Sequence, residues 1–304
     1  MEQRAENRFI EFSLLVLLSF LWGSSFTLIK VAVETVPPAT IVAGRLAIGA
    51  PLLILLVIAR RIEIPTAPAI WGAFLVQGIL QSALPFTLIS WGEKYIDSGL
   101  AGLLNSTPPL FAFLITFLIL REGGAALPKF TGVATGFAGV LVTLGPEVLA
   151  GSSNSVVGQL AVTGASLSYA VAAIYARRFS NQPAILTAAC SMTMATILML
   201  PISFYVDGPW AFSPSAEAVW SIVALGVFST AFAMIIYFRL VQTLGTLGVT
   251  SGSYLRAGFS VLLGVVLLNE ELSLSLFIGL VLIFLGVAIV TGQVRWPTGR
   301  NEAS

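Results

Sequence analysis

The sequence predicts an all-α integral membrane protein with ten transmembrane helices, arranged as two inverted five-helix repeats with both termini in the cytoplasm. Three observations lead to this prediction. Of the 304 residues, 57% are hydrophobic and only 10% are charged, whereas a soluble domain carries about 25% charged residues. Apolar stretches of bilayer-spanning length recur along the chain. Related patterns also recur in its two halves.

A membrane-spanning helix needs about 20 mostly apolar residues. In order along the chain, the segments that qualify are 11–33, 38–59, 68–91, 96–120, 128–145, 157–176, 183–205, 216–238, 245–268 and 272–293. The polar start, MEQRAENRFIEF, runs directly into the first segment and lacks the pattern of a cleavable signal peptide. Because the connections are short, we expect one compact bundle.

The placement of lysine and arginine predicts the orientation, since cytoplasmic loops are enriched in both. With the N-terminus in the cytoplasm, most of the 15 basic residues fall at cytoplasmic ends: Arg4, Arg8, Arg60, Arg61, Arg121, Lys129, Arg177, Arg178, Arg239, Arg295 and Arg300. The opposite loops carry acids such as Glu93, Asp97 and Glu270. This segregation fits ten spans better than nine or eleven.

The two halves can be aligned directly. At an offset of 148, FLVQGILQSALPF (74–86) matches IVALGVFSTAFAM (222–234), and LILRE (118–122) matches VLLNE (266–270). At an offset of 147, GVATGFAGVLVTLG (132–145) matches GLVLIFLGVAIVTG (279–292). Each half has an odd number of spans, so the second copy must be inverted in the membrane. The predicted units are a first repeat at 1–147, a second at 156–293 and a cytoplasmic tail at 294–304.

The residue inventory argues against several classes of function. The chain has no histidine and a single cysteine, Cys190, so Ser-His-Asp and Cys-His chemistry, the HExxH zinc site and an internal disulfide are excluded. It also lacks a GxxxxGK[ST] phosphate-binding loop. We therefore expect no enzyme activity, no cofactor and no metal. The net charge of +1 argues against nucleic acid, so the expected partners are a small-molecule substrate and the lipid bilayer, and the expected state is a monomer.

The pattern resembles the drug/metabolite transporter superfamily and its EamA-type ten-helix exporters. FLWGSSF (20–26), Lys30 and Arg45 carry the resemblance, together with LREG and LNEE, each followed by a glycine-spaced last helix. The resemblance implies a basket of ten helices that exports small metabolites across the bacterial inner (plasma) membrane. Within that group the chain is similar to YddG-type amino-acid exporters.

Polar residues inside apolar spans are the first candidates for substrate binding. Ser98, Gly102, Asn105 and Pro109 fall on one face of the fourth span, since residues three and four apart share a face. Such groups face a wet cavity or pack between helices. For Asn105 and its repeat equivalent Ser253 we favour the cavity, and for the repeated glycines we favour packing. Gln77 and Gln81, followed by Ser82, offer amides and a hydroxyl to a zwitterion or a water chain.

Aromatic and basic residues complete the predicted site. Trp22 and Tyr169 occupy equivalent positions and suit an apolar part of the ligand, although core packing explains such residues equally well. Arg256 lies near the middle of the ninth span and either attracts a carboxylate or holds free backbone carbonyls. The predicted substrate-binding residues are Trp22, Ser24, Gln77, Gln81, Ser82, Asn105, Tyr169, Phe228, Ser253, Tyr254 and Arg256.

A second group is predicted to have gating or structural roles. Lys30 and Arg45 are expected to extend outward and pair with Glu34, and Pro85 to bend the third span. Glu122 and Glu270, repeat equivalents at helix ends, are expected to hold loops. The complete group is Lys30, Arg45, Pro85, Pro108, Glu122 and Glu270.

Together these features predict a secondary transporter that exports amino acids, including aromatic and other neutral ones, through a largely uncharged cavity by alternating access. No carboxylate lies near the middle of a span, which favours facilitated or weakly coupled export. One alternative is export of other metabolites or drugs, such as purines or cationic compounds. Alternatives from other classes are an intramembrane enzyme and a passive channel.

Overall fold

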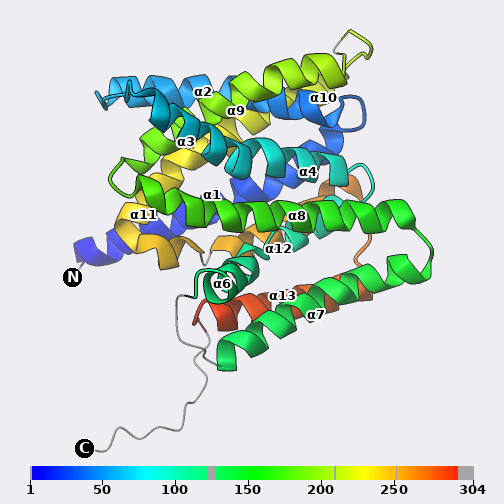
Figure 1. Ribbon diagram of the computed structural model, residues 1–304. Helices are drawn as coiled ribbons and strands as arrows, with labels where there is room; N and C mark the ends of the chain where they lie inside the picture. Colours follow the sequence, from blue (N-terminus) through cyan, green and yellow to red (C-terminus); the bar gives the residue numbers. More distant parts are fainter. Residues whose placement is uncertain (1, 122–126, 209, 251, 294–304) are drawn as a thin grey trace, which may run out of the picture.

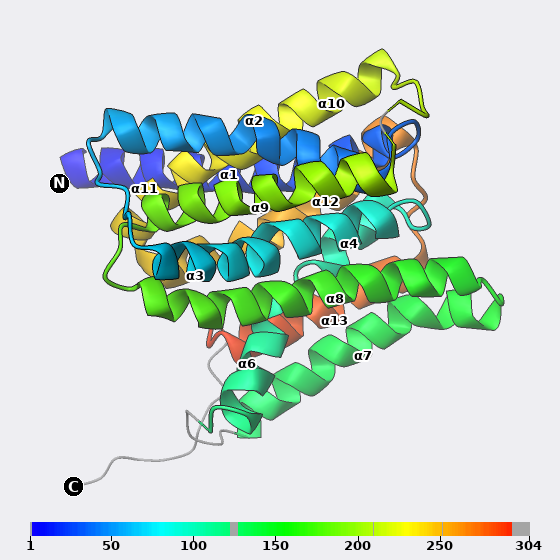
Figure 2. The ribbon, with the colours of Figure 1, turned by 45° about the horizontal axis from the view of Figure 1, so that its top comes forward.

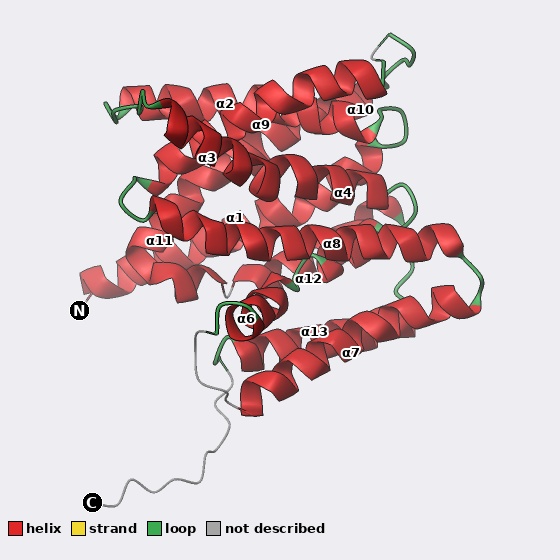
Figure 3. Cartoon of the chain, in the orientation of Figure 1, coloured by secondary structure: helices red, strands yellow, loops and turns green. Residues whose placement is uncertain are grey.

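The computed structural model describes residues 2–121, 127–208, 210–250 and 252–293, and within these ranges all regular structure is helical (Figure 1, Figure 3). The first half contains α1 (Glu2–Ala32), α2 (Pro38–Ala59), α3 (Pro68–Gly78), η1 (Ile79–Ala83), α4 (Leu84–Gly92), α5 (Ser98–Leu104), α6 (Pro108–Leu118) and α7 (Leu127–Leu149). The second half contains α8 (Ser153–Tyr175), η2 (Ala176–Phe179), α9 (Ala184–Val206), α10 (Ala216–Gly226), η3 (Val227–Phe232), α11 (Ala233–Thr250), α12 (Gly252–Leu268) and α13 (Leu274–Val290).

Seven helical stretches of the described chain are long and apolar enough to cross a membrane. They are Ile10–Ala32, Pro38–Ala59, Pro68–Gly92, Ser98–Leu118, Ser153–Phe179, Ala184–Val206 and Ala216–Leu244. Two shorter apolar helices, Tyr254–Leu268 and Leu274–Val290, follow. The expected fifth span, 128–145, falls within α7. The all-helical membrane architecture predicted from composition is thus confirmed at this level.

Two expected spans differ from the observed helices. The segment 96–120 is divided into α5 and α6, because consecutive prolines at 108 and 109 have no N–H to donate and remove two helical hydrogen bonds. The eighth span was expected to end at residue 238, but α11 continues to Thr250. No proline interrupts this stretch, so its backbone remains helical.

The long helices run side by side, with their connecting loops at the two ends of the bundle (Figure 2). The closest partners are α7 with α13, α2 with α9, α1 with α12, and α4 with α8. Glycines allow the α7–α13 contact: a Cβ added to Gly286 would clash with the backbone of Gly136. The packing role predicted for these two glycines is confirmed.

Candidate functional site

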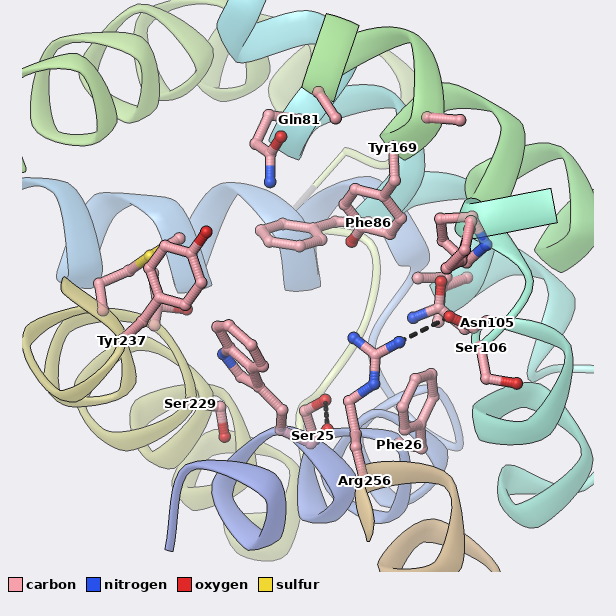
Figure 4. Close-up of a pocket in the computed structure, with 18 of the residues that line it drawn as sticks. Ser25, Phe26, Gln81, Phe86, Asn105, Ser106, Tyr169, Ser229, Tyr237 and Arg256 are labelled. Atoms are coloured by element: carbon pink, nitrogen blue, oxygen red, sulfur yellow. Dashed lines mark hydrogen bonds between the residues drawn. The ribbon is translucent and has the colours of Figure 1, made fainter. Parts of the chain in front are cut away.

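A cavity of about 650 Å³ lies between the helices. Its walls come from α1, α2, α4, α6, α8, α9, α11, α12 and α13, from the η1 and η3 turns, and from the break between α5 and α6. Figure 4 shows Arg256 pointing into this space, with Gln81, Phe86 and Tyr169 on the opposite wall. A cavity of this size falls within the usual range for small-molecule sites.

The break between α5 and α6 brings backbone carbonyl groups to the wall of the cavity. In a continuous helix, residue 108 would donate to the carbonyl of Leu104 and residue 109 to that of Asn105, but both donors are prolines. The Leu104 carbonyl instead accepts from the hydroxyls of Thr107 at 2.7 Å and Ser166 at 3.0 Å. The Leu104 carbonyl that the interruption leaves free is therefore hydrogen-bonded by side chains of the break itself and of α8.

Arg256 satisfies the second free carbonyl. Its Nη2 donates to the backbone oxygen of Asn105 at 2.6 Å, and its Nε has no hydrogen-bond partner among the described residues. The Asn105 side chain also lines the cavity, and its Oδ1 accepts from the Ser166 hydroxyl at 3.4 Å. Arg256 thus links α12 of the second half to the interrupted helix of the first.

Arg45 borders the same cavity from α2 and is only 6% exposed. Its Nε donates to Thr230 Oγ1 at 2.8 Å, and its guanidinium carbon lies 3.9 Å from the centre of the Phe86 ring. Among the described residues no Asp or Glu lines the cavity. The expectation of a largely uncharged cavity is therefore wrong, because two guanidinium groups face it.

Two π-helical turns place polar side chains on the wall. η1 carries Gln81, and η3 carries Ser229 and Thr230, all of which line the cavity. A π turn adds one residue to the helical repeat and is frequent at functional sites. The predicted bend at Pro85 falls next to η1, but Ala233 occupies the corresponding place after η3. Proline is thus not required for this local geometry.

Aromatic rings form the apolar part of the wall. The rings of Trp22 and Tyr237 lie 5.6 Å apart, tilted by 43°. Phe86 and Tyr169 line the cavity from α4 and α8. The site therefore combines flat apolar faces with a few polar groups, an arrangement typical of pockets for small organic molecules.

Five predicted substrate-binding residues meet at this cavity: Trp22, Gln81, Asn105, Tyr169 and Arg256. Further lining residues had not been predicted, namely Phe86, Ser229, Thr230 and Met234. The repeat contained a signal for two of them, since shifting Gln81 and Ser82 by 148 positions leads to Ser229 and Thr230.

Three predicted polar residues do not line the cavity. The Ser24 hydroxyl donates to the carbonyl of Leu21 at 3.1 Å. Gln77 is buried in the helix packing, and its amide nitrogen donates to Oε1 of Gln81 at 3.5 Å. Ser82 is fully buried, and its hydroxyl has no partner in the described part of the chain.

Two other predicted contacts, Phe228 and Tyr254, also lie away from the cavity. Phe228 is 51% exposed on the outside of the bundle, where a π turn has rotated it away from the centre. Tyr254 packs edge-on against Phe284, with ring centres 5.2 Å apart. Ser253 belongs to α12, but its side chain lies outside the described part of the structure.

Polar contacts join separate segments at the end of the bundle beyond the cavity. Glu270 accepts hydrogen bonds from the backbone N–H groups of Ser98 at 2.7 Å and Gly99 at 2.9 Å, at the start of α5. Asp207 accepts from the N–H of Thr40 at 2.7 Å and from its hydroxyl at 2.9 Å. Carboxylates at helix N-termini are favourable because the N–H groups there are otherwise unpaired.

Lys30 occupies the same end, but it is not paired with Glu34 as expected. Its ammonium donates to the carbonyls of Glu93 at 2.9 Å and Ile96 at 2.7 Å, because these carbonyls at the end of α4 have no helical partner. Arg45 likewise does not extend outward as expected, since it lines the cavity; Pro108, expected to have a gating or structural role, lines the cavity too. Glu122 lies outside the described residues.

Glu93 follows α4 and is fully buried, although the sequence placed it in an outer loop. Neither of its carboxyl oxygens has a hydrogen-bond partner among the described residues. Burial raises the pKa of this carboxyl well above its ordinary value; Lys30 and Arg45 oppose the effect and Glu270 adds to it. The closed end therefore contains a buried acid that favours its protonated form.

Known proteins match the chain along most of its length. The model of the EamA-like transporter family matches twice, at residues 10–145 and 156–292. The uncharacterized transporter YvbV of Bacillus subtilis is 28% identical, covering 93% of this chain and 92% of that protein. The uncharacterized inner membrane transporter YedA of Escherichia coli K12 is 26% identical, covering 94% and 92%. One solved crystal structure has the same fold, with a TM-score of 0.64 at 23% identity over 96% of this chain and 99% of the other.

Proposed function

Because this chain belongs to the EamA-like transporter family, we propose that it is a secondary transporter that exports amino acids, including aromatic and other neutral ones, from the cytoplasm by alternating access. The observation that carries the proposal is the central cavity, whose wall combines aromatic rings with amide, hydroxyl and guanidinium groups. These groups match the polar ends and the apolar side chain of a small amino acid. The proposed location is a bacterial inner (plasma) membrane.

The proposed architecture is ten spans in two inverted repeats. Supporting it, η1 and η3 begin 148 positions apart, at Ile79 and Val227. Cavity-lining residues also pair at the repeat offsets: Trp22 with Tyr169, Phe26 with Ala173 and Arg45 with Met192 at 147, and Gln81 with Ser229, Phe86 with Met234 and Pro108 with Arg256 at 148.

The contacts between helices are also consistent with the repeat, because mapping each half onto the other exchanges one set of contacts for the other. The repeat relates the contact of α1 with α12 to the contact of α8 with α5 and α6. It relates the contact of α4 with α8 to that of α1 with α10 and α11. The pairs α2–α9 and α7–α13 map onto themselves. Such an exchange is expected of two halves that can rock around a shared site.

In the proposed transport cycle this conformation is open to the cytoplasm. The cavity extends to Tyr237 and Thr291, at the end that the lysine and arginine distribution assigns to the cytoplasm. The Glu270 and Asp207 contacts close the opposite end. Export would require these contacts to open while the cytoplasmic side closes. Since no acid among the described residues lines the cavity, the proposal is facilitated or weakly coupled export.

Reconstituted vesicles test the proposal. Vesicles preloaded with labelled threonine, methionine or phenylalanine should release them faster than protein-free vesicles. Ala173 lines the cavity at an exposed position, so Ala173→Trp should fill the cavity and slow release about tenfold or more. Phe228→Trp adds the same side chain on the outer surface and serves as the matched control. Release equal to that of protein-free vesicles for all three amino acids would refute amino-acid export.

A further inference from the structure

The cavity has an unbalanced charge. Arg45 and Arg256 both line it, from α2 and α12, and among the described lining residues there is no carboxylate. Tyr169, which also lines the cavity, lies close enough to both guanidinium groups to interact electrostatically with each. Arg45 lies 3.9 Å from the Phe86 ring, and Arg256 points in from the opposite wall (Figure 4), so the two cations flank the same space.

Within the described part of the chain, neither guanidinium has an acceptor for each of its donors. Arg45 uses Nε for Thr230, and no described hydrogen bond involves its two terminal nitrogens, although the residue is only 6% exposed. Arg256 uses Nη2 for the Asn105 carbonyl. A guanidinium has five N–H donors, so both groups retain donors that no described acceptor satisfies.

A buried cation with unused donors is stabilised by an anion, and arginine forms its strongest hydrogen bonds with carboxylates and phosphates. The other polar side chains of the wall, among them Gln81, Asn105 and Ser229, are neutral. An ammonium group in the same cavity would meet two positive charges and only neutral acceptors. The charged groups of the wall are therefore matched to the carboxylate of an amino acid, and its ammonium end has only the neutral acceptors.

We propose that Arg45 and Arg256 form a carboxylate-binding subsite beside Tyr169, and that the substrate class is organic monoanions with an apolar or aromatic body, for which an α-ammonium group is not required. This proposal rests on the transport function proposed above and deepens it. The carboxylate would lie between the two guanidinium groups, with its apolar body against Trp22 and Tyr237. Amino acids would bind as carboxylates, and cationic compounds would be excluded.

Compounds with matched carbon skeletons test separately how much the carboxylate and the ammonium of the ligand contribute to binding. 3-Phenylpropionate is phenylalanine without its ammonium, and phenethylamine is phenylalanine without its carboxylate. The aliphatic series is 4-methylpentanoate, leucine and 3-methylbutylamine. Dissociation constants for the purified protein would come from ligand-induced shifts in melting temperature at neutral pH. We expect each carboxylate to bind at least as tightly as its amino acid, and each amine at least about tenfold more weakly, since removing a charge-assisted contact costs that much.

Each outcome is decisive. If the amino acids bind and the deaminated acids do not, amino-acid export stands and the subsite proposal fails. If the deaminated acids bind and the amino acids do not, the subsite proposal stands and amino-acid export fails. Binding of the amines alone, or no binding in either series, refutes the subsite proposal.

Variants locate the subsite. Arg256→Gln should weaken carboxylate binding about tenfold or more, and Arg256→Lys should restore part of it by retaining the charge without the planar fork. Arg45→Gln should act in the same direction, and its melting temperature without ligand reports whether it folds. Arg239→Gln removes an arginine that pairs with Glu11 at 3.1 Å on the surface and should leave binding unchanged. Unchanged carboxylate affinity in Arg256→Gln would overturn the assignment.

Discussion

The two ends of the bundle are held together by different kinds of contact. At the closed end, charged side chains from one segment bind backbone groups of another, as Glu270 does at Ser98 and Lys30 does at Glu93. Toward the other end lies the cavity, which aromatic rings and polar side chains line. Directional contacts can be broken and remade as units. In the cavity wall, Arg45 and Arg256 also bond to another segment, whereas neutral side chains such as Gln81 and Ser229 line the cavity without a described bond to another helix. We therefore expect substitutions at the closed end to affect stability and those in the cavity wall to affect binding.

The largest effect is expected at Glu270. Glu270→Ala leaves two N–H groups at the start of α5 without their charged acceptor, so the free energy of unfolding should fall by about 3 kcal/mol. Thermal unfolding in detergent would measure the change. The neighbouring exposed residue provides the control, Glu271→Ala, which should be nearly neutral. Equal losses in the two variants would mean that the Glu270 contact does not hold the closed end.

Asp207 should have a smaller effect of the same kind. Asp207→Asn keeps one acceptor oxygen but removes the charge that binds the N–H and hydroxyl of Thr40. The expected loss is about 1–2 kcal/mol in the free energy of unfolding. Combined with Glu270→Ala, the losses should add, because the two contacts join different helices. A strongly non-additive double variant would show that the contacts form a single coupled latch.

Glu93 should make stability depend on pH. Its pKa is raised from an ordinary value of 4.5, so between that value and the raised pKa the native state binds more protons than the unfolded state. Stability should therefore fall as the pH rises through this interval. Glu93→Gln should remove that slope, and melting temperatures measured from pH 5 to pH 9 would test it. The same slope in Glu93→Gln as in the wild type would contradict the prediction; Glu34→Gln, at an exposed acid of this end, is the control that should retain it.

The smallest effect on stability is expected in the cavity wall. The Ser229 hydroxyl is buried without a partner among the described residues. Ser229→Ala should therefore change the free energy of unfolding by less than about 0.5 kcal/mol, while substrate affinity falls measurably. A large loss of stability would indicate that the wall also supports the fold, which would remove the distinction between the two ends.

The sequence predicted the features that depend on local patterns. Hydrophobic length located the membrane-crossing stretches, and the repeat offset placed Trp22 and Tyr169 together at the cavity that both line. It could not locate features set by contacts between distant helices. Phe228 and Gln81 both belong to π turns, and only the observed helix rotation shows that the first faces outward and the second inward. The burial of Glu93 likewise depends on neighbours far along the chain.

The central claim is that a polar cavity lies inside the bundle, open at the cytoplasmic end and closed at the other. Single cysteines at Gln81 and Ser229 test it directly in a Cys190→Ser background, which removes the one native thiol. A charged, membrane-impermeant thiol reagent should label both in inside-out vesicles and neither in right-side-out vesicles, and Phe228→Cys, which faces away from the cavity, should remain unlabelled. Labelling of Gln81→Cys and Ser229→Cys only from the outer side, or from neither side, would contradict the account.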